Sequence, residues 1–150
     1  MRAVIQRVEL ASVLIRDKTK SEIGPGLLVF IGIEENDNDD DINWLCSKIL
    51  KLRIFSDEKG IMNLSVSDID GDIMVISQFT LHALTRKGNR PSYIKAAKPE
   101  SAIPLYTRFI DKLDKNYNRE IKTGEFGAMM EISLINSGPV TIFIDTKNKE

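Results

Sequence analysis

Residues 129–145 read MMEISLINSGPVTIFID, in which two stretches rich in apolar, β-branched residues flank a central NSGP. This pattern predicts two strands, Met129–Asn136 and Val140–Asp145. Gly138 accepts unusual backbone dihedrals and Pro139 lacks an N–H, so the simplest interpretation of NSGP is the turn of a hairpin. A Gly-Pro peptide bond can also be cis at a small cost, which would turn neighbouring carbonyls to one side as a rigid wall of acceptors. The residues themselves leave both interpretations open.

Further strands and two helices are indicated along the rest of the chain. Stretches rich in Val and Ile predict strands at 2–8, 12–17, 26–33 and 73–81. Apolar residues recur at spacings of three and four from Asp39 to Leu52 and from Ile103 to Asn116, which predicts two amphipathic helices. Pro104 is expected in the first turn of the second helix, where its missing N–H is tolerated. Strands at both ends with helices between them predict an α+β fold with mixed sheets.

The composition is that of a soluble globular domain. A chain of 150 residues fits one domain, and 42% hydrophobic with 29% charged residues is ordinary for that class. No apolar run approaches the roughly 20 residues of a membrane helix, and the N-terminus does not resemble a secretory signal, so we expect a cytoplasmic protein. With one cysteine and one histidine, a zinc site of four Cys or His ligands cannot form within one chain. Cys46 falls in the first helical pattern and is expected to be buried.

The charge is unevenly distributed although the net charge is −1. Residues 73–99 contain no acidic residue but include Arg86, Lys87 and Arg90. Such a run is either a solvated surface or a contact for phosphates and nucleic acid.

The lone His82 decides whether an acyl-transfer triad is conceivable, because no phosphate loop, dinucleotide fingerprint or Gly-x-Ser-x-Gly elbow is present. If the strand extends to residue 82, Thr80 and His82 share one face about 6.6 Å apart. A Thr–His pair is then one interpretation. A histidine that is exposed or hydrogen-bonded is the other.

The segment SQFTL, residues 77–81, ends a buried strand with polar residues that need partners if they lie inside. Either the strand emerges at the surface, or its end delivers hydroxyl, amide and backbone N–H groups to a pocket.

Eight segments in register carry a resemblance to a known family. They are MRAVIQRV, GLLVFIGI, KILKLRIF, MNLSV, SQFTL, TRKGNRPS, TGEFGAMM and NSGPVTIFID. In their order and spacing the whole chain resembles the D-aminoacyl-tRNA deacylases, also called D-tyrosyl-tRNA(Tyr) deacylases. The resemblance implies one α+β domain over residues 1–150, in which mixed and antiparallel sheets form a barrel-like sandwich flanked by two main helices. It also implies a cytoplasmic homodimer that releases D-amino acids from tRNA without a cofactor, a metal or a membrane.

The resemblance further implies a pocket at the dimer interface. The implied catalytic residues are Ser77, Gln78, Phe79 and Thr80, and the implied substrate-binding and chiral-selection residues are Gly138, Pro139, Arg7, Phe126 and Met130. The partner's Gly-cis-Pro would project its carbonyls into the pocket, Arg7 would hold that segment, and Phe126 and Met130 would line the site near the terminal adenosine. The basic residues Arg86, Lys87 and Arg90 would then contact tRNA phosphates.

A wall of backbone carbonyls would leave room for the Cα hydrogen of a D substrate and collide with an L side chain, while glycine would be accepted to some degree. We expect the backbone N–H groups of Phe79 and Thr80 to form an oxyanion hole. The attack itself is assigned either to water assisted by the ribose 2′-hydroxyl of the tRNA or to Thr80 as nucleophile, with the first preferred. His82 stands where the family usually has an aromatic residue, which favours a packing role over a catalytic one. The alternative functions are a non-catalytic module that binds the tRNA end and a Thr–His hydrolase of small esters.

Overall fold

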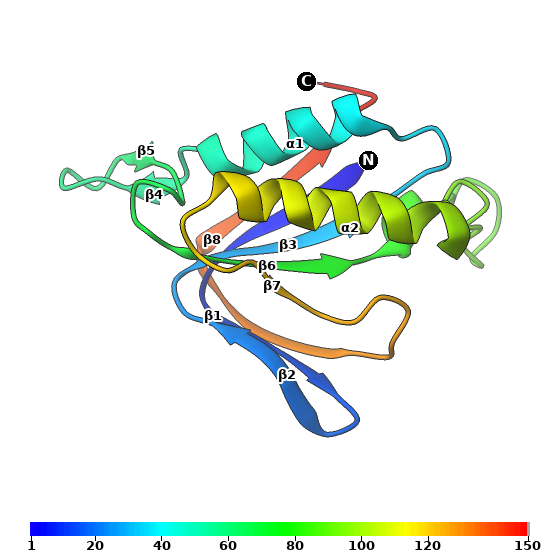
Figure 1. The fold of residues 1–150 in the computed structure, drawn as a ribbon, viewed down its shortest axis with the longest axis horizontal. Coiled ribbons are helices and arrows are strands. Elements are labelled where there is room, and N and C mark those ends of the chain that lie inside the picture. The colour runs from blue at the N-terminus through cyan, green and yellow to red at the C-terminus, as the bar shows by residue number, and fades with distance from the viewer. Residues whose placement is uncertain (150) are drawn as a thin grey trace.

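A computed structural model describes residues 1–149 as eight strands, two α-helices and a short 3-10 helix (Figure 1). In chain order these are β1 (Arg2–Ile15), β2 (Lys18–Ile23), β3 (Gly26–Gly32), α1 (Asp39–Lys51), β4 (Phe55–Ser56), β5 (Met62–Leu64), β6 (Asp72–Ser77), η1 (Phe79–His82), α2 (Pro99–Asn116), β7 (Lys122–Thr123) and β8 (Glu131–Asp145).

The long strand β1 organises the main sheet. One edge of β1 pairs antiparallel with β8, and the other pairs with β3 along its first half and with β2 along its second half. The strands β3 and β6 are parallel, as are β6 and β7. The Ser21 hydroxyl on β2 donates to the Thr123 carbonyl on β7 at 2.7 Å, so the far strands approach each other and the mixed sheet curls into a nearly closed barrel. The predicted α+β fold class is confirmed.

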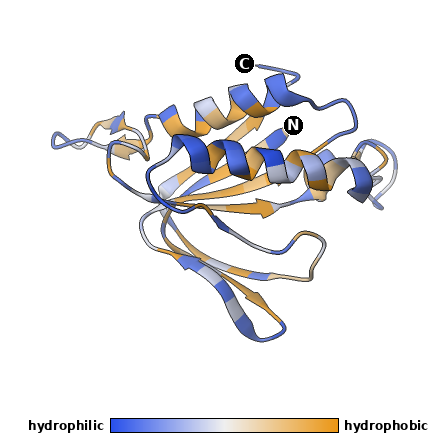
Figure 2. Cartoon of the chain, in the orientation of Figure 1, coloured by the Kyte–Doolittle hydropathy of each residue, from blue (hydrophilic) through white to orange (hydrophobic). Residues whose placement is uncertain are grey.

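Two apolar clusters hold this arrangement together. One lies between the sheet and the two helices, with Leu45, Ile49, Phe109 and Leu113 fully buried. The other fills the curled half of the sheet around Met74. Both helices cover the same side of the sheet, and Figure 2 shows hydrophilic residues on their outward surfaces. Within residues 1–149, no helix combines the length and the apolarity that crossing a membrane would require.

The helix α1 matches its prediction to within a residue, and its start has a clear local cause. The Asn38 side chain accepts hydrogen bonds from the backbone N–H groups of Asp40 and Asp41, and the Asp41 carboxylate accepts one from the Asn38 N–H. This reciprocal capping satisfies N–H groups that the helix itself cannot, and the aspartates suit the positive end of the helix dipole.

The prediction for α2 was wrong at its start. The helix begins at Pro99, where a proline costs no hydrogen bond, so Pro104 lies inside the helix and not in its first turn. Because Pro104 has no N–H, the second turn of α2 lacks one backbone hydrogen bond, at a cost of about 3 kcal/mol. Leu105, Tyr106 and Phe109 are buried against the sheet, and at about 1.5–3 kcal/mol for each such side chain their burial outweighs that loss.

The two strands predicted around NSGP do not form a hairpin. Both belong to β8, and both pair with β1 instead of with each other. Asn136 lies opposite Val8 and Thr141 opposite Gln6, so residues 137–140 of β8 stand opposite the single residue Arg7. NSGP is therefore a wide bulge within one pairing and not a turn.

The strand predicted over 73–81 ends early. β6 stops at Ser77, and Phe79 to His82 form the 3-10 helix η1. Gln78, Thr80 and His82 consequently do not share the face of a strand, and the geometry assumed for a Thr–His pair is absent.

The close pairing of β3 with β6 depends on Gly26. A Cβ at this position would lie 2.0 Å from the backbone oxygen of Asp72, a distance that the pairing cannot absorb without moving backbone. We predict that Gly26→Ala lowers the free energy of unfolding, measured with urea, by on the order of 3 kcal/mol. Gly24→Ala is the matched control, because the nearest atom to its Cβ is the Asp72 carboxylate at 3.6 Å. The control should change stability by no more than about 0.5 kcal/mol, and equal effects of the two substitutions would refute this account of the pairing.

Candidate active site

A cavity of about 380 Å³ opens where the parallel strands β3 and β6 end. Its walls come from Ser77, Gln78 and Phe79 on one side and from the segment Phe126–Met130 on the other. Apolar residues of β3, α2 and β8, among them Ile31, Ala102 and Ile132, complete the lining. Five of the predicted site residues therefore meet in one cavity: Ser77, Gln78, Phe79, Phe126 and Met130.

Backbone donors at the start of η1 face no partner within the helix. The first N–H groups of any helix are unsatisfied internally, and here these belong to Phe79 and Thr80. The Gln78 side chain makes no capping hydrogen bond to them, and its Nε2 donates to the Thr80 hydroxyl at 2.5 Å. The Gln78 N–H is anchored to the Ile31 carbonyl at 2.7 Å, which fixes the start of η1 to the end of β3. The site thus offers two positioned N–H groups beside the cavity.

The opposite wall is positioned by packing. The ring of Phe126 lies edge-on to the buried ring of Tyr106, with centroids 5.6 Å apart. Gly127 has a φ of +77°, which a residue with a side chain rarely adopts. A Cβ on Gly124 would lie 2.5 Å from the Met130 sulfur. Glycines 124 and 127 therefore let this segment pack closely enough to line the cavity, a requirement that sequence reasoning missed because each glycine reads as an ordinary loop residue.

The bulge at Gly138-Pro139 is held from inside its own chain. Arg7 Nε donates to the Ser137 carbonyl at 2.9 Å, and Arg7 Nη1 donates to the Ile54 carbonyl. The Asn136 side chain spans the bulge by accepting from the Val140 N–H at 2.9 Å and donating to the Val140 carbonyl at 3.3 Å. Gly138 and Pro139 themselves are exposed, and the peptide bond between them is cis. Asn136 is a further residue of this site that the sequence did not single out.

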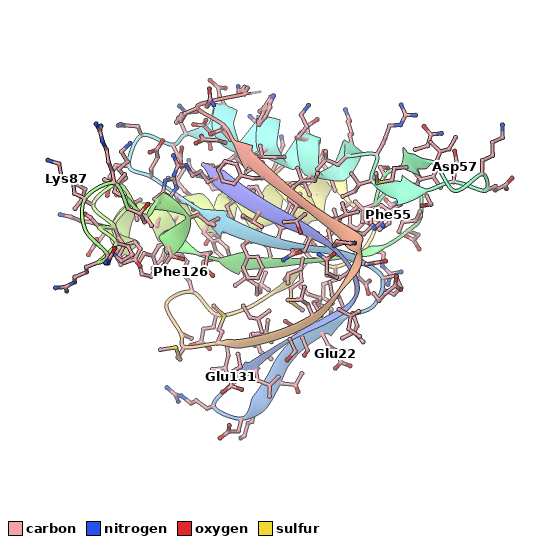
Figure 3. The ribbon with its side chains drawn as sticks, turned by 180° about the vertical axis from the view of Figure 1, so that it is seen from behind. Glu22, Phe55, Asp57, Lys87, Phe126 and Glu131 are labelled. Carbon is pink, nitrogen blue, oxygen red and sulfur yellow. The ribbon has the colours of Figure 1, made fainter. Side chains whose placement is uncertain are left out.

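The bulge lies far from the cavity of the same chain. Arg7 pairs with Leu27 at the start of β3, whereas the cavity begins at Ile31, four residues or roughly 13 Å further along that strand. Along β8, the cavity is lined by Ile132, and Gly138 lies six residues, or roughly 20 Å, further along that strand. In Figure 3, Phe126 lies on the side of the molecule that carries Lys87, and Phe55, which follows the Ile54 that Arg7 contacts, lies on the opposite side. The structure therefore does not bring Gly138 and Pro139 to the cavity that holds Phe126.

The lone histidine is buried behind η1. His82 is 1% exposed, and within residues 1–149 neither of its ring nitrogens has a hydrogen-bond partner. A Cβ on Gly32 would lie 2.9 Å from its ring, which shows how closely the imidazole packs on β3. Burial, with a smaller contribution from the nearby Arg2 cation, lowers the pKa of His82. The expectation of an exposed histidine was wrong, and the imidazole is packed closely against the backbone at Gly32.

The predicted basic residues lie on the exposed loop between η1 and α2. Two reciprocal backbone hydrogen bonds between Leu84 and Ser92, at 2.8 and 3.0 Å, close this loop. Within residues 1–149, Arg86, Lys87 and Arg90 form no ion pair, so their charges are available to a ligand. Figure 3 shows Lys87 at the same end of the molecule as Phe126.

The remaining groups of interest in metal or thiol chemistry lie elsewhere. Cys46 is buried as predicted, and its burial raises the pKa of its thiol to about 12. Among the described residues, no three His, Cys, Asp or Glu side chains gather in a way that could hold a metal ion.

An apolar cavity with a few convergent polar groups at its edge is typical of a small-ligand pocket in an enzyme.

Comparison with known proteins defines the family. The model of the D-Tyr-tRNA(Tyr) deacylase family matches residues 4–145. Proteins named D-aminoacyl-tRNA deacylase from Flavobacterium psychrophilum and Bacteroides thetaiotaomicron are each 61% identical over 150 residues, which is the full length of both chains in each comparison. The chain therefore belongs to the D-Tyr-tRNA(Tyr) deacylase family.

Two solved structures share the fold. One, named "c-Myc DNA Unwinding Element Binding Protein", is 41% identical and superposes with a TM-score of 0.92 over 97% of this chain and 98% of its own. The other, described as a probable eukaryotic D-amino acid tRNA deacylase, is 17% identical with a TM-score of 0.81 over 95% of this chain and 97% of its own.

The burial of His82 predicts a pH-dependent stability. Its pKa in the folded protein lies below that of an unfolded histidine, about 6.5, so the unfolded state takes up the proton first and stability falls as the pH drops through that value. We predict that His82→Leu, which removes this titration, loses less stability than the wild type between pH 7.5 and 5.5, as measured by urea unfolding. Because the carboxylates titrate in both proteins, the difference between the two profiles isolates His82. His82→Phe is a second variant that removes the titration. If the stability profiles of both variants run parallel to that of the wild type between pH 7.5 and 5.5, the prediction is contradicted.

Proposed function

We propose that this protein hydrolyses the ester bond of D-aminoacyl-tRNA and releases the free D-amino acid and tRNA. The observation that carries the proposal is the start of η1 at the cavity edge, in a chain that belongs to this deacylase family. Within residues 1–149 the N–H groups of Phe79, which lines the cavity, and of the adjacent Thr80 have no hydrogen-bond partner. An aminoacyl ester is already activated, so its hydrolysis needs a positioned water and donors for the developing oxyanion more than it needs a strong base. Ser77, Gln78, Phe79 and Thr80 supply the catalytic wall in this proposal.

The base in this reaction is assigned to the ribose 2′-hydroxyl of the tRNA. Thr80 could act as nucleophile only with a group to take its proton, and the lone histidine is buried away from it without a hydrogen bond to the hydroxyl. The Thr80 hydroxyl already accepts from Gln78, which suits a residue that positions water. The same observations disfavour the Thr–His hydrolase of small esters.

Selection of the D isomer is proposed to come from the Gly138-Pro139 bulge of a second subunit. The bulge is exposed, is fixed by Arg7 and Asn136, and cannot reach the cavity of its own chain. A homodimer would bring it to the partner's cavity. Exposed apolar side chains near the bulge, Leu10, Ile135 and Phe143, support such a contact, and Phe143 is 58% exposed.

A backbone wall would discriminate by exclusion. The carbonyls of Gly138 and its neighbour would occupy the space that an L side chain needs while leaving room for the hydrogen of a D substrate. Glycyl-tRNA, which has no side chain to collide, is expected to be hydrolysed to some degree. Phe126 and Met130 are proposed to hold the terminal adenosine in the cavity.

The rest of the tRNA is proposed to run over the basic loop. Arg86, Lys87 and Arg90 are exposed and unpaired within the described chain, as residues that contact phosphates must be. We place the reaction in the cytoplasm, where charged tRNA is used, and assign it to residues 1–150 as a single domain. The alternative is a non-catalytic module that binds the tRNA end. One solved relative is named as a DNA-binding protein, which is the observation that favours this alternative.

Amino-acid release from matched D-Tyr-tRNA and L-Tyr-tRNA tests the proposal. With a chelator present, we predict that the purified protein releases D-tyrosine at least about 100-fold faster than L-tyrosine, because a steric clash of several kcal/mol separates the two transition states. Gly-tRNA should fall between them. Binding of tRNA without release of either isomer would refute the deacylase function and support the binding module. Equal release of both isomers would refute the proposal that a backbone wall selects the D isomer.

A further inference from the structure

An exposed aromatic pair stands at the rim of the cavity, outside the residues assigned above to the terminal adenosine. Phe79, the first residue of η1, is 57% exposed, and Tyr93 is 37% exposed. Their ring centroids lie 5.0 Å apart with the planes at 77°, so the edge of one ring meets the face of the other. The Tyr93 hydroxyl has no hydrogen-bond partner within residues 1–149, and Ile94 beside it is 83% exposed. Large apolar side chains at the surface beside a cavity mark a contact surface.

The pair is held in place before any ligand arrives. Ser92, which precedes Tyr93, is joined by two backbone hydrogen bonds to Leu84, and Leu84 lies two residues after the end of η1. The Ala96 N–H donates to the Tyr93 carbonyl at 3.0 Å, and the Ala97 N–H donates to the Ile33 carbonyl at 2.9 Å, which ties the following residues to the end of β3. The rings are therefore presented by a backbone fixed on both sides. A fixed ring loses little conformational freedom when it binds.

The position of the pair identifies its ligand. Phe79 lines the cavity, and the loop that begins two residues after η1 carries Arg86, Lys87 and Arg90, which form no ion pair within residues 1–149. Tyr93 follows this loop directly and its ring contacts Phe79, so the pair adjoins both the cavity and the basic loop that a bound single strand would span. Exposed aromatic rings beside cationic side chains are the usual platform on which single-stranded bases stack.

We propose that Phe79 and Tyr93 form a stacking subsite for the base of the penultimate nucleotide, the cytidine that precedes the terminal adenosine of tRNA. Tyr93, which lies outside the cavity lining, supplies the ring on which the base stacks, and Phe79 supports it through their edge-to-face contact. Stacking needs no particular base, so the subsite adds affinity for the tRNA end without reading its sequence. The inference rests on the proposed function, because it assumes that the terminal adenosine occupies the cavity.

Three non-hydrolysable probes separate the base from its phosphate. The first is 3′-amino-3′-deoxyadenosine that carries D-tyrosine through an amide. The second adds a phosphate and an abasic ribose at its 5′ side, and the third adds a full cytidylate. The Kd of each probe is measured at the same two salt concentrations for the wild type, for Tyr93→Ala and for Tyr93→Phe. The last variant keeps the ring and loses only a hydroxyl that has no partner.

We predict that the cytidylate probe binds the wild type about ten-fold more tightly than the abasic probe, as stacking of one base provides. This gain should disappear in Tyr93→Ala and remain in Tyr93→Phe. The step from the first probe to the second, which reports the phosphate, should be the same in all three proteins and should weaken with salt. A structural role of Tyr93 would instead weaken all three probes together.

Two results would overturn the subsite. One is a wild type that binds the cytidylate and abasic probes equally, and the other is a base gain that survives in Tyr93→Ala. If either result is found while D-Tyr-tRNA is hydrolysed normally, the proposed subsite is refuted and the proposed function stands. If the wild type neither binds the first probe nor hydrolyses D-Tyr-tRNA, the proposed function fails and the subsite fails with it.

Discussion

The antiparallel pairing of β1 with β8 is the contact on which the rest of this structure depends. Because β1 also pairs with β3 and β2 on its other edge, any slip of β8 would displace the barrel as a whole. The bulge opposite Arg7 lets this pairing run almost the full length of both strands while four residues leave the sheet. Arg7 and Asn136 satisfy backbone groups that the bulge takes out of the ladder. An exposed, rigid Gly138-Pro139 is thus a consequence of how the sheet is built.

The cavity follows from the other end of the same sheet. β6 stops at Ser77, and the chain turns into η1, whose start is fixed to Ile31. Within residues 1–149, that change from strand to helix leaves the N–H groups of Phe79 and Thr80 without a hydrogen-bond partner where the parallel strands end. Ligands commonly bind outside the carboxyl ends of parallel strands. The bulge and the cavity therefore lie at opposite ends of one rigid sheet, which is the arrangement that a symmetric dimer needs if each subunit is to complete the site of the other.

Much of the fold could be predicted from the sequence, and the errors share a physical cause. β3 and α1 were predicted because their patterns are strong and their boundaries carry local signals, such as the Asn38 cap. The hairpin at NSGP was wrong because Gly and Pro favour a turn and a bulge alike, and only the pairing partner, which is far away in the sequence, distinguishes the two. The end of β6 was missed because Phe79 and Thr80 favour strands. The length of α2 was missed because tertiary burial outweighs the cost of Pro104.

The site residues were named by resemblance more than by residue chemistry. Ser77 to Phe79, Phe126 and Met130 meet in one cavity, while Arg7 and Gly138 contact each other at a distance from it. The residues alone gave no reason to expect this division, because it is set by strand register. The glycines at 124 and 127 and the bridging Asn136 were not predicted, since their roles depend on close approach within the folded chain.

The central claim is that the wall and the cavity of one site come from different subunits, and a mixed dimer tests it most directly. One subunit carries Ala128→Trp, which fills its cavity, and the other carries Gly138→Ala, which strains the bulge because its φ is +130° and a Cβ would lie 2.6 Å from Arg7. The one open cavity then belongs to the Gly138→Ala subunit and faces the native bulge of its partner. The account predicts that the mixed dimer hydrolyses only D-Tyr-tRNA, whereas the Gly138→Ala homodimer also hydrolyses L-Tyr-tRNA. Hydrolysis of L-Tyr-tRNA by the mixed dimer would show that the wall acts within one chain and would contradict the account.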